Sequence, residues 1–231
     1  MKATRRERRL LTCEHGGNDV PPEFAHLFED VDAALQSHRG WDPGALDVFG
    51  RLAPLGDAAI PAATTRLLVD LNRSLHHPRV FSEFTRSLPR AAREEIIACW
   101  WRPWRTRVAG TIAGWRKAGD RVCHLSVHSF APVLGDRIRN ADIGLLYDPS
   151  RPAERDFCLR WQALLAERGW RVRRNYPYRG SADGHTTALR RTFQTGYAGI
   201  ELELNQALFP RLLDALCRDL HDTLRAMQNP G

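Results

Sequence analysis

Two histidines stand directly after segments that are typical of buried β-strands. His15 follows the strand expected over Leu10–Glu14 and precedes a pair of glycines, and His128 follows the strand expected over Val122–Val127. In open α/β sheets, ligands gather beyond the carboxyl ends of the strands. Neutral imidazole is the commonest metal ligand, and catalytic zinc usually takes three protein ligands and a water. One such histidine is more often structural, but two of them together predict a metal site.

The third metal ligand is open between Glu14, Asn18 and Asp42. Asparagine is a poor zinc ligand, and Glu14 would point away from His15 if the strand continued. Asp42 lies in a loop just before an expected helix start, so it is free to reach the site. The pattern therefore favours Asp42 and leaves the other two as alternatives.

Two glutamates alternate with apolar residues in the strand expected over Gly199–Leu204. The alternation puts Glu201 and Glu203 on one face. A half-buried carboxylate needs a partner, and burial can raise its pKa into the range of a general base. The alternative is a solvent-facing pair on an edge strand, which the segment taken alone favours.

Asn72 and Arg73 follow another short apolar run, Arg66–Leu71, which is predicted to form a buried strand. An arginine beside an asparagine at a strand end can hold a carboxylate through charge-assisted, bidentate hydrogen bonds. A surface salt bridge is the simpler interpretation of this pair taken alone.

Strand and helix signals alternate along the 231 residues, which predicts one α/β domain. Residues 74–90 are expected to form a loop, and Pro103 is expected to kink the longest helix. Besides the strands already named, the expected elements are a helix starting at 42–45, the long helix over 91–118, a strand at 143–147, a helix at 153–168, a strand at 170–174 and a C-terminal amphipathic helix.

Composition excludes several classes of protein. No apolar run approaches the roughly 20 residues that span a bilayer, and the basic N-terminus lacks a signal-peptide core. The five cysteines are far apart and form no CxxC pair, so neither a disulfide framework nor a cysteine-rich zinc site is indicated. The net charge of +7 comes from scattered arginines without a nucleic-acid-binding signature. We therefore expect a cytoplasmic protein without nucleic-acid or membrane partners.

Taken in order, six motifs resemble those of the N-formylglutamate amidohydrolases, and they span most of the chain. Each is weak alone, but the ordered set is fairly specific. They are Glu14–Pro21, His38–Asp42, Arg66–Arg73, Val127–Ser129, Asn175–Gly180 and Glu201–Gln206.

The resemblance implies a fold similar to that of the zinc carboxypeptidases and of the deacylases of succinylglutamate and acetylaspartate. The expected architecture is a phosphorylase/hydrolase-like α/β domain over residues 1–231, with three layers and a mixed central sheet. It also implies one Zn²⁺ and hydrolysis of an N-formyl or other N-acyl amide of an acidic amino acid, as in histidine degradation. Nothing in the pattern indicates an oligomeric state.

Roles for individual residues follow from the same resemblance. The carboxypeptidase-like relatives take two ligands from a His-x-x-Glu segment, but Asn18 stands at the glutamate position here, which again favours Asp42. Glu203 is preferred to Glu201 as the general base that takes a proton from water. The implied metal ligands are His15, Asp42 and His128; Arg66 would stabilise the oxyanion; Asn72 and Arg73 would bind the α-carboxylate; and Tyr178, Arg179 and His185 would lie in a loop closing over the substrate.

Two other functions compete with this prediction. One is a non-catalytic, arginine-rich protein that binds nucleic acid or an acidic partner, and the other is a zinc carboxypeptidase-like peptidase. The binding protein needs no metal site, so it predicts that His15, Asp42 and His128 lie apart in the fold.

Overall fold

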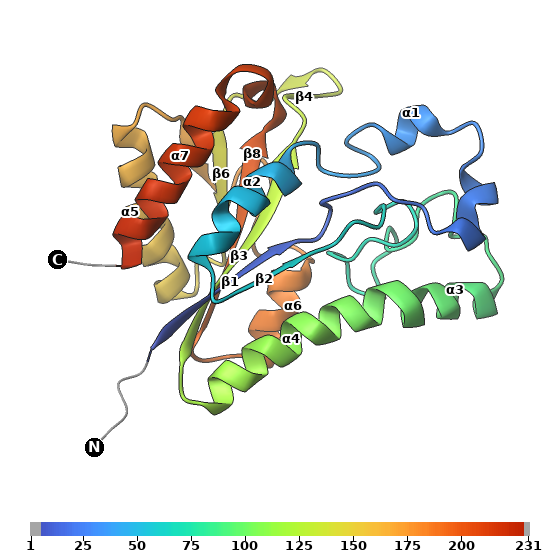
Figure 1. Cartoon of the computed structure of the whole chain (residues 1–231), viewed down its shortest axis with the longest axis horizontal. Coiled ribbons are helices and arrows are strands. Elements are labelled where there is room, and N and C mark those ends of the chain that lie inside the picture. The colour runs from blue at the N-terminus through green and yellow to red at the C-terminus, as the bar shows by residue number, and fades with distance from the viewer. Residues whose placement is uncertain (1–5, 229–231) are drawn as a thin grey trace.

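A six-stranded mixed sheet forms the centre of the computed structural model, which describes residues 6–228 (Figure 1). Four neighbouring strands run parallel, and β6 pairs antiparallel with β8. In sheet order the strands are β2 (Ala58–Pro61), β1 (Glu7–Cys13), β3 (Arg121–Phe130), β8 (Tyr197–Asn205), β6 (Ile143–Leu146) and β7 (Val172–Arg174). A separate hairpin of β4 (Val133–Leu134) and β5 (Arg137–Ile138) follows β3.

Helices cover both faces of the sheet, which confirms the expected three layers (Figure 1). Helices α2 (Ala45–Leu52), α5 (Pro152–Glu167) and α7 (Phe209–Gln228) pack on one face, and α4 (Arg102–Lys117) and α6 (His185–Thr192) on the other. Shorter helices are α1 (Asp32–Leu35), α3 (Arg90–Ile96) and the turns at Pro22–Phe28, Ala53–Leu55, Ile97–Trp101 and Gln206–Leu208. Among the described residues, no helix is long and apolar enough to cross a membrane.

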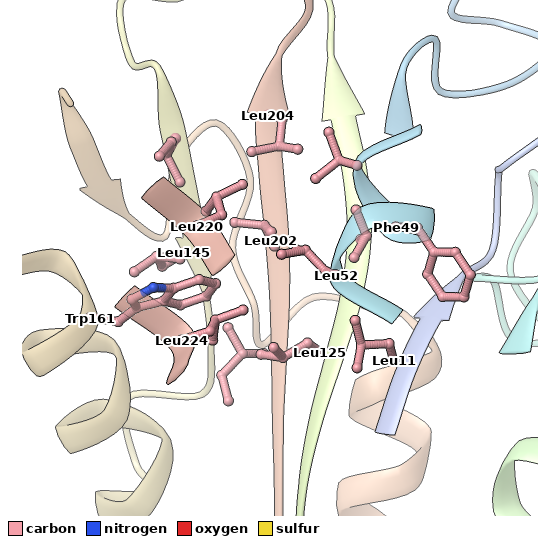
Figure 2. Close-up of a cluster of buried hydrophobic side chains, with 14 of the residues drawn as sticks. Leu11, Phe49, Leu52, Leu125, Leu145, Trp161, Leu202, Leu204, Leu220 and Leu224 are labelled. Carbon is pink, nitrogen blue, oxygen red and sulfur yellow. The ribbon is translucent and has the colours of Figure 1, made fainter. Parts of the chain in front are cut away.

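The two faces of the central strands differ in chemistry because side chains alternate along a strand. One face is apolar: Leu125 and Leu202 pack against Trp161 of α5 and Leu220 of α7 (Figure 2). The opposite face is polar although it is buried. It carries Thr12 from β1, His124, Ser126 and His128 from β3, and Glu201 and Glu203 from β8.

The prediction of a strand over Arg66–Leu71 is wrong, because this segment forms turns. Its apolar residues are buried in a second core beside the sheet, which includes Leu68, Val80 and Ile96. The amide of Asp70 donates to the carbonyl of Val80 at 2.8 Å, so a loop takes the place of a neighbouring strand. The apolar run indicated burial correctly, but burial alone does not specify a strand.

Other elements also differ from the expected ones. β3 continues to Phe130, so His128 lies within the strand and not after it. β2 and α6 were not expected from the sequence. The long helix is present, and a π-helical turn at Ile97–Trp101 ends two residues before Pro103, which has no amide hydrogen to donate to that turn.

We expect Leu202→Ala to lower the free energy of unfolding by about 2–5 kcal/mol, because it leaves a cavity in the buried apolar face. Denaturant unfolding measures this change. As a control, Leu212→Ala removes a side chain that is 43% exposed on α7 and should change stability by less than about 0.5 kcal/mol. Equal effects of the two substitutions would contradict the assignment of Leu202 to the core.

Candidate metal and substrate site

Three residues far apart in the sequence meet at the carboxyl ends of β1 and β3. His15, Asp42 and His128 each offer one ligand atom, and these atoms lie within 4.8 Å of one another, all buried. His15 lies two residues after the end of β1, and Asp42 lies in the loop just before α2. The amide of Asp42 donates to the carbonyl of His15 at 2.9 Å, which fixes that loop to the strand end.

The side chains of this cluster face a common point. His128 Nδ1 lies 2.9 Å from Asp42 Oδ2, and His15 Nδ1 lies 3.4 Å from the same oxygen. His15 Nδ1 is fully buried and has no hydrogen-bond partner within residues 6–228. Buried polar atoms are rarely left unpaired in folded proteins, so this atom indicates that the cluster holds a further group.

The outer nitrogen of each histidine is held by a polar partner, which sets the tautomer. His15 Nε2 lies 2.7 Å from Asp70 Oδ1, and His128 Nε2 lies 2.9 Å from Ser126 Oγ. Ser126 gives its only proton to Glu14 at 2.6 Å, so it must accept one from His128. In the neutral imidazoles, both Nδ1 atoms therefore carry a lone pair that faces the cluster. Partners of this kind orient metal-binding histidines in many proteins.

The charges around the cluster favour a cation. Burial opposes protonation of His128, but the hydrogen bond and charge of Asp42, together with the charge of Glu14, raise its pKa to about 10. The pKa of His15 is also raised, because Asp70 and Asp42 outweigh burial and the charge of Arg66. A metal ion between the histidines and Asp42 would supply the positive charge that these carboxylates favour, so the residues present fit a metal.

Glu203 faces this cluster from the neighbouring strand. It pairs in register with His128, and its Oε2 is buried without a hydrogen-bond partner in the described part of the chain. Burial raises the pKa of Glu203 to about 7, with His128 opposing the rise and Asp42 adding to it. Glu201, by contrast, accepts a 2.5 Å hydrogen bond from Thr186. Because β8 lies inside the sheet, the edge-strand alternative for these acids is wrong.

A cavity of about 370 Å³ opens onto the three clustered residues. Of the side chains predicted to act at the site, it brings together His15, Asp42, Arg66, Asn72, Arg73, His128, Tyr178, Arg179 and Glu203, with Glu201 beside them. We call this space the substrate cavity.

Arg66 joins the ligand cluster to the wall of the substrate cavity. It donates to Asp42 Oδ1 at 3.2 Å and to Asp70 Oδ2 at 3.0 Å. Both carboxylates also contact the histidines, so Arg66 fixes the acids that orient them. A guanidinium has five N–H donors, so these two bonds leave donors for a ligand in the cavity.

The turn that carries Asn72 and Arg73 is held by the end of the π-helical turn and by the first turn of α4. Trp101 Nε1 and Arg105 Nη1 donate to the carbonyl of Arg73 at 3.0 and 3.2 Å. Asn72 Oδ1 accepts from the amide of His185 at 2.7 Å. These bonds keep both side chains at the cavity wall without using the sheet.

The loop with Tyr178 and Arg179 is fixed at both ends. Asn175 Oδ1 accepts from the amides of Tyr147 and Gly180 at 3.1 and 3.0 Å. A Cβ on Gly180 would lie 2.1 Å from the Tyr147 nitrogen, so only glycine allows this approach. The loop therefore presents Tyr178 and Arg179 on a defined backbone.

His185 is the one predicted site residue that does not line the substrate cavity. The residue expected in the closing loop instead begins α6. His185 is buried there, and the centroid of its ring lies 5.1 Å from that of Trp104. Its Nδ1 lies 3.4 Å from Glu14 Oε1. The segment has no apolar run at helical spacing, so the sequence pattern gave no sign of this helix.

Asp70 and Ser126 support the cluster but were not predicted as such. Glu14, an alternative third ligand, accepts a hydrogen bond from Ser126 at 2.6 Å. Ser126 was detectable in principle, because His124, Ser126 and His128 alternate with apolar residues and so share one strand face. Asp70 carried no comparable signal, since its contact with His15 depends on how a loop folds. Asn18, an alternative third ligand, points elsewhere and donates to the carbonyl of Leu35 at 3.0 Å.

Comparison with known proteins identifies the family of the chain. The family model of N-formylglutamate amidohydrolase matches residues 8–209. The chain belongs to the N-formylglutamate amidohydrolase family. Members of this family hydrolyse an amide, and so the enzyme interpretation replaces that of a non-catalytic binding protein.

Solved structures show the same fold as this amidohydrolase family member. A gene product of Agrobacterium tumefaciens is 27% identical, with a TM-score of 0.80, over 96% of this chain and 92% of that one. An N-formylglutamate amidohydrolase from Ralstonia eutropha is 18% identical, with a TM-score of 0.68, over 98% and 94% of the two chains. No curated protein matches the chain in sequence.

We expect Ser126→Ala to weaken binding of a divalent metal ion by about 10- to 100-fold, because it removes the acceptor that holds His128 Nε2. Titration against a chelator measures the affinity. Ser150→Ala, an exposed serine outside the substrate cavity, is the matched control and should leave the affinity unchanged. Metal affinity that is insensitive to both substitutions would show that Ser126 does not orient a ligand.

Proposed function

We propose that this amidohydrolase uses Zn²⁺ to cleave the N-formyl group, or another N-acyl group, from an acidic amino acid such as N-formyl-L-glutamate. The observation that carries the proposal is the convergence of His15, Asp42 and His128 around a buried, unpaired His15 Nδ1. Two imidazoles and one carboxylate form a donor set that is usual for catalytic zinc.

His15, Asp42 and His128 would hold the zinc ion. When bound there, zinc would supply Lewis-acid polarisation of the amide carbonyl and a water of lowered pKa. Asp70 and Ser126 would keep the histidine ring nitrogens turned toward the ion.

Glu203 would move the protons of the reaction. Its carboxylate takes a proton from the attacking water, whose oxygen bonds to the acyl carbon. As the bond from that carbon to nitrogen breaks, Glu203 passes the proton to the leaving amine, and the products are formate and the free amino acid. A carboxyl whose pKa is about 7 can do both near neutral pH.

Arg66 would stabilise the oxyanion that develops on the carbonyl oxygen. It is held in place by Asp42 and Asp70 before any ligand arrives. Donors that are fixed in advance stabilise developing charge without reorganisation at the moment of reaction.

The remaining residues of the cavity would select an acidic substrate. Asn72 and Arg73 would hold the α-carboxylate, and Arg179 with Tyr178 would meet the side-chain carboxylate. All four residues line the substrate cavity, on turns whose backbones are held by hydrogen bonds from or to neighbouring side chains. Guanidinium groups suit this task because they bind carboxylates in a bidentate manner.

Metal analysis and one variant test the proposal. Purified protein should contain about one zinc per chain, and Glu203→Gln should keep that zinc while turnover falls by about 100- to 10,000-fold. Formate release from N-formyl-L-glutamate measures turnover, and release of the free amino acid compares it with N-acetyl and N-succinyl amino acids. Glu201→Gln is the matched control and should lower turnover far less. Near-normal turnover in Glu203→Gln would exclude Glu203 as the base.

We expect kcat/KM to rise with pH through the acid range and to level off near neutrality. The base must be deprotonated, and Glu203 with a pKa of about 7 is protonated at lower pH. A bound cation lowers the pKa of a nearby carboxyl, so the inflection should fall at about 7 or below. A pH profile of the zinc-loaded enzyme measures it. A profile that falls across the same range would contradict the role of Glu203.

A further inference from the structure

A second cavity, of about 340 Å³, adjoins the substrate cavity and is rich in arginine. Its charged lining consists of Arg39, Arg66, Arg73, Arg79 and Arg86 with Asp70 and Glu83. We call it the arginine pocket. Arg66, Arg73 and Arg79 line both cavities, so the two spaces share a wall.

Positive charge in the arginine pocket is not balanced by the protein. Asp70 is occupied by Arg66 and His15, and Glu83 pairs with Arg39. Within residues 6–228, neither Arg79 nor Arg86 has a carboxylate within 4.0 Å. Guanidinium groups that face one cavity without counter-ions attract an anion into it.

The segment that carries the unpaired arginines is anchored between Arg79 and Arg86. Val80, next to Arg79, is buried in the second core. Thr85, next to Arg86, is buried and donates to the carbonyl of Leu68 at 3.0 Å. The two guanidinium groups are therefore displayed from a backbone that is already ordered, which reduces the entropy lost when a ligand binds.

The shared wall determines what kind of ligand reaches the arginine pocket. In the proposed function, on which this inference rests, Arg73 holds the α-carboxylate of the acidic amino acid. In an N-acyl dipeptide this carboxyl group is a neutral peptide amide, whose carbonyl oxygen can still accept a hydrogen bond from Arg73. The residue that follows the amide then enters the neighbouring pocket. We propose that the arginine pocket binds a second acidic residue, so that N-acylated acidic dipeptides are substrates of this site.

Binding to a catalytically impaired protein tests this directly. Calorimetry with zinc-loaded Glu203→Gln compares N-formyl-Glu-Glu with N-formyl-Glu-Ala, which differ in one side-chain carboxylate. We expect the acidic peptide to bind about five- to tenfold more tightly, the effect of a partly exposed ion pair with more than one guanidinium. Equal affinities, or no measurable binding of either peptide, would overturn the proposal.

A second substitution locates the contact. Arg86 lines the arginine pocket but not the substrate cavity. Adding Arg86→Ala should reduce the difference between the two peptides to about twofold or less, whereas Arg211→Ala, at an exposed arginine of α7 outside both cavities, should preserve it. A preference that survives Arg86→Ala would contradict the assignment.

Failure of the proposed function gives a different result. In that case wild-type protein releases no formate from N-formyl-L-glutamate or from either peptide, whatever the calorimetry shows. If formate is released from N-formyl-L-glutamate but the peptides bind with equal affinity, only the inference about the arginine pocket fails.

Discussion

Buried negative charge is the constraint on which the structure of this site depends. Glu14, Asp42 and Asp70 are all buried at the carboxyl ends of the strands, where an uncompensated carboxylate would be very costly. Histidines and Arg66 keep the pKa values of Asp42 and Asp70 well below their usual range against the effect of burial. The acids therefore stay ionised, and the fold is stable only while cationic or hydrogen-bonding groups face them.

The same balance explains why one carboxylate differs from the others. Glu203 also lies in this region, but no arginine donates to it and one of its oxygens has no hydrogen-bond partner among residues 6–228. The pKa of Glu203 is accordingly raised to about 7, while the pKa values of Glu14, Asp42 and Asp70 are lowered. Carboxyl groups whose environments separate their pKa values in this way can divide the tasks of binding a cation and transferring a proton.

Much of this arrangement was accessible from the sequence, because it depends on strands. The α/β class, the place of His15 and the shared face of Glu201 and Glu203 follow from short-range apolar patterns, and the three layers were implied by the family resemblance. The rest depends on contacts between distant loops. The segment Arg66–Leu71 was predicted as a strand since its apolar content indicates burial, yet its backbone amides donate to the carbonyls of Gly40, Thr65 and Val80. No local pattern specifies such a pairing, and for the same reason the contact of Asp70 with His15 was not foreseen.

The fold gathers at one cavity several arginines that are scattered along the sequence. Along the sequence the arginines are scattered, and as a bulk property the charge of +7 indicates only a preference for anionic ligands. In the structure, four arginines come from one segment that forms turns and is not part of the sheet. They are Arg66, Arg73, Arg79 and Arg86. A strand would have sent alternate side chains to opposite faces, whereas successive turns can direct several guanidinium groups toward the same side. The irregular backbone between residues 66 and 88 therefore concentrates a dispersed charge beside His15, Asp42 and His128.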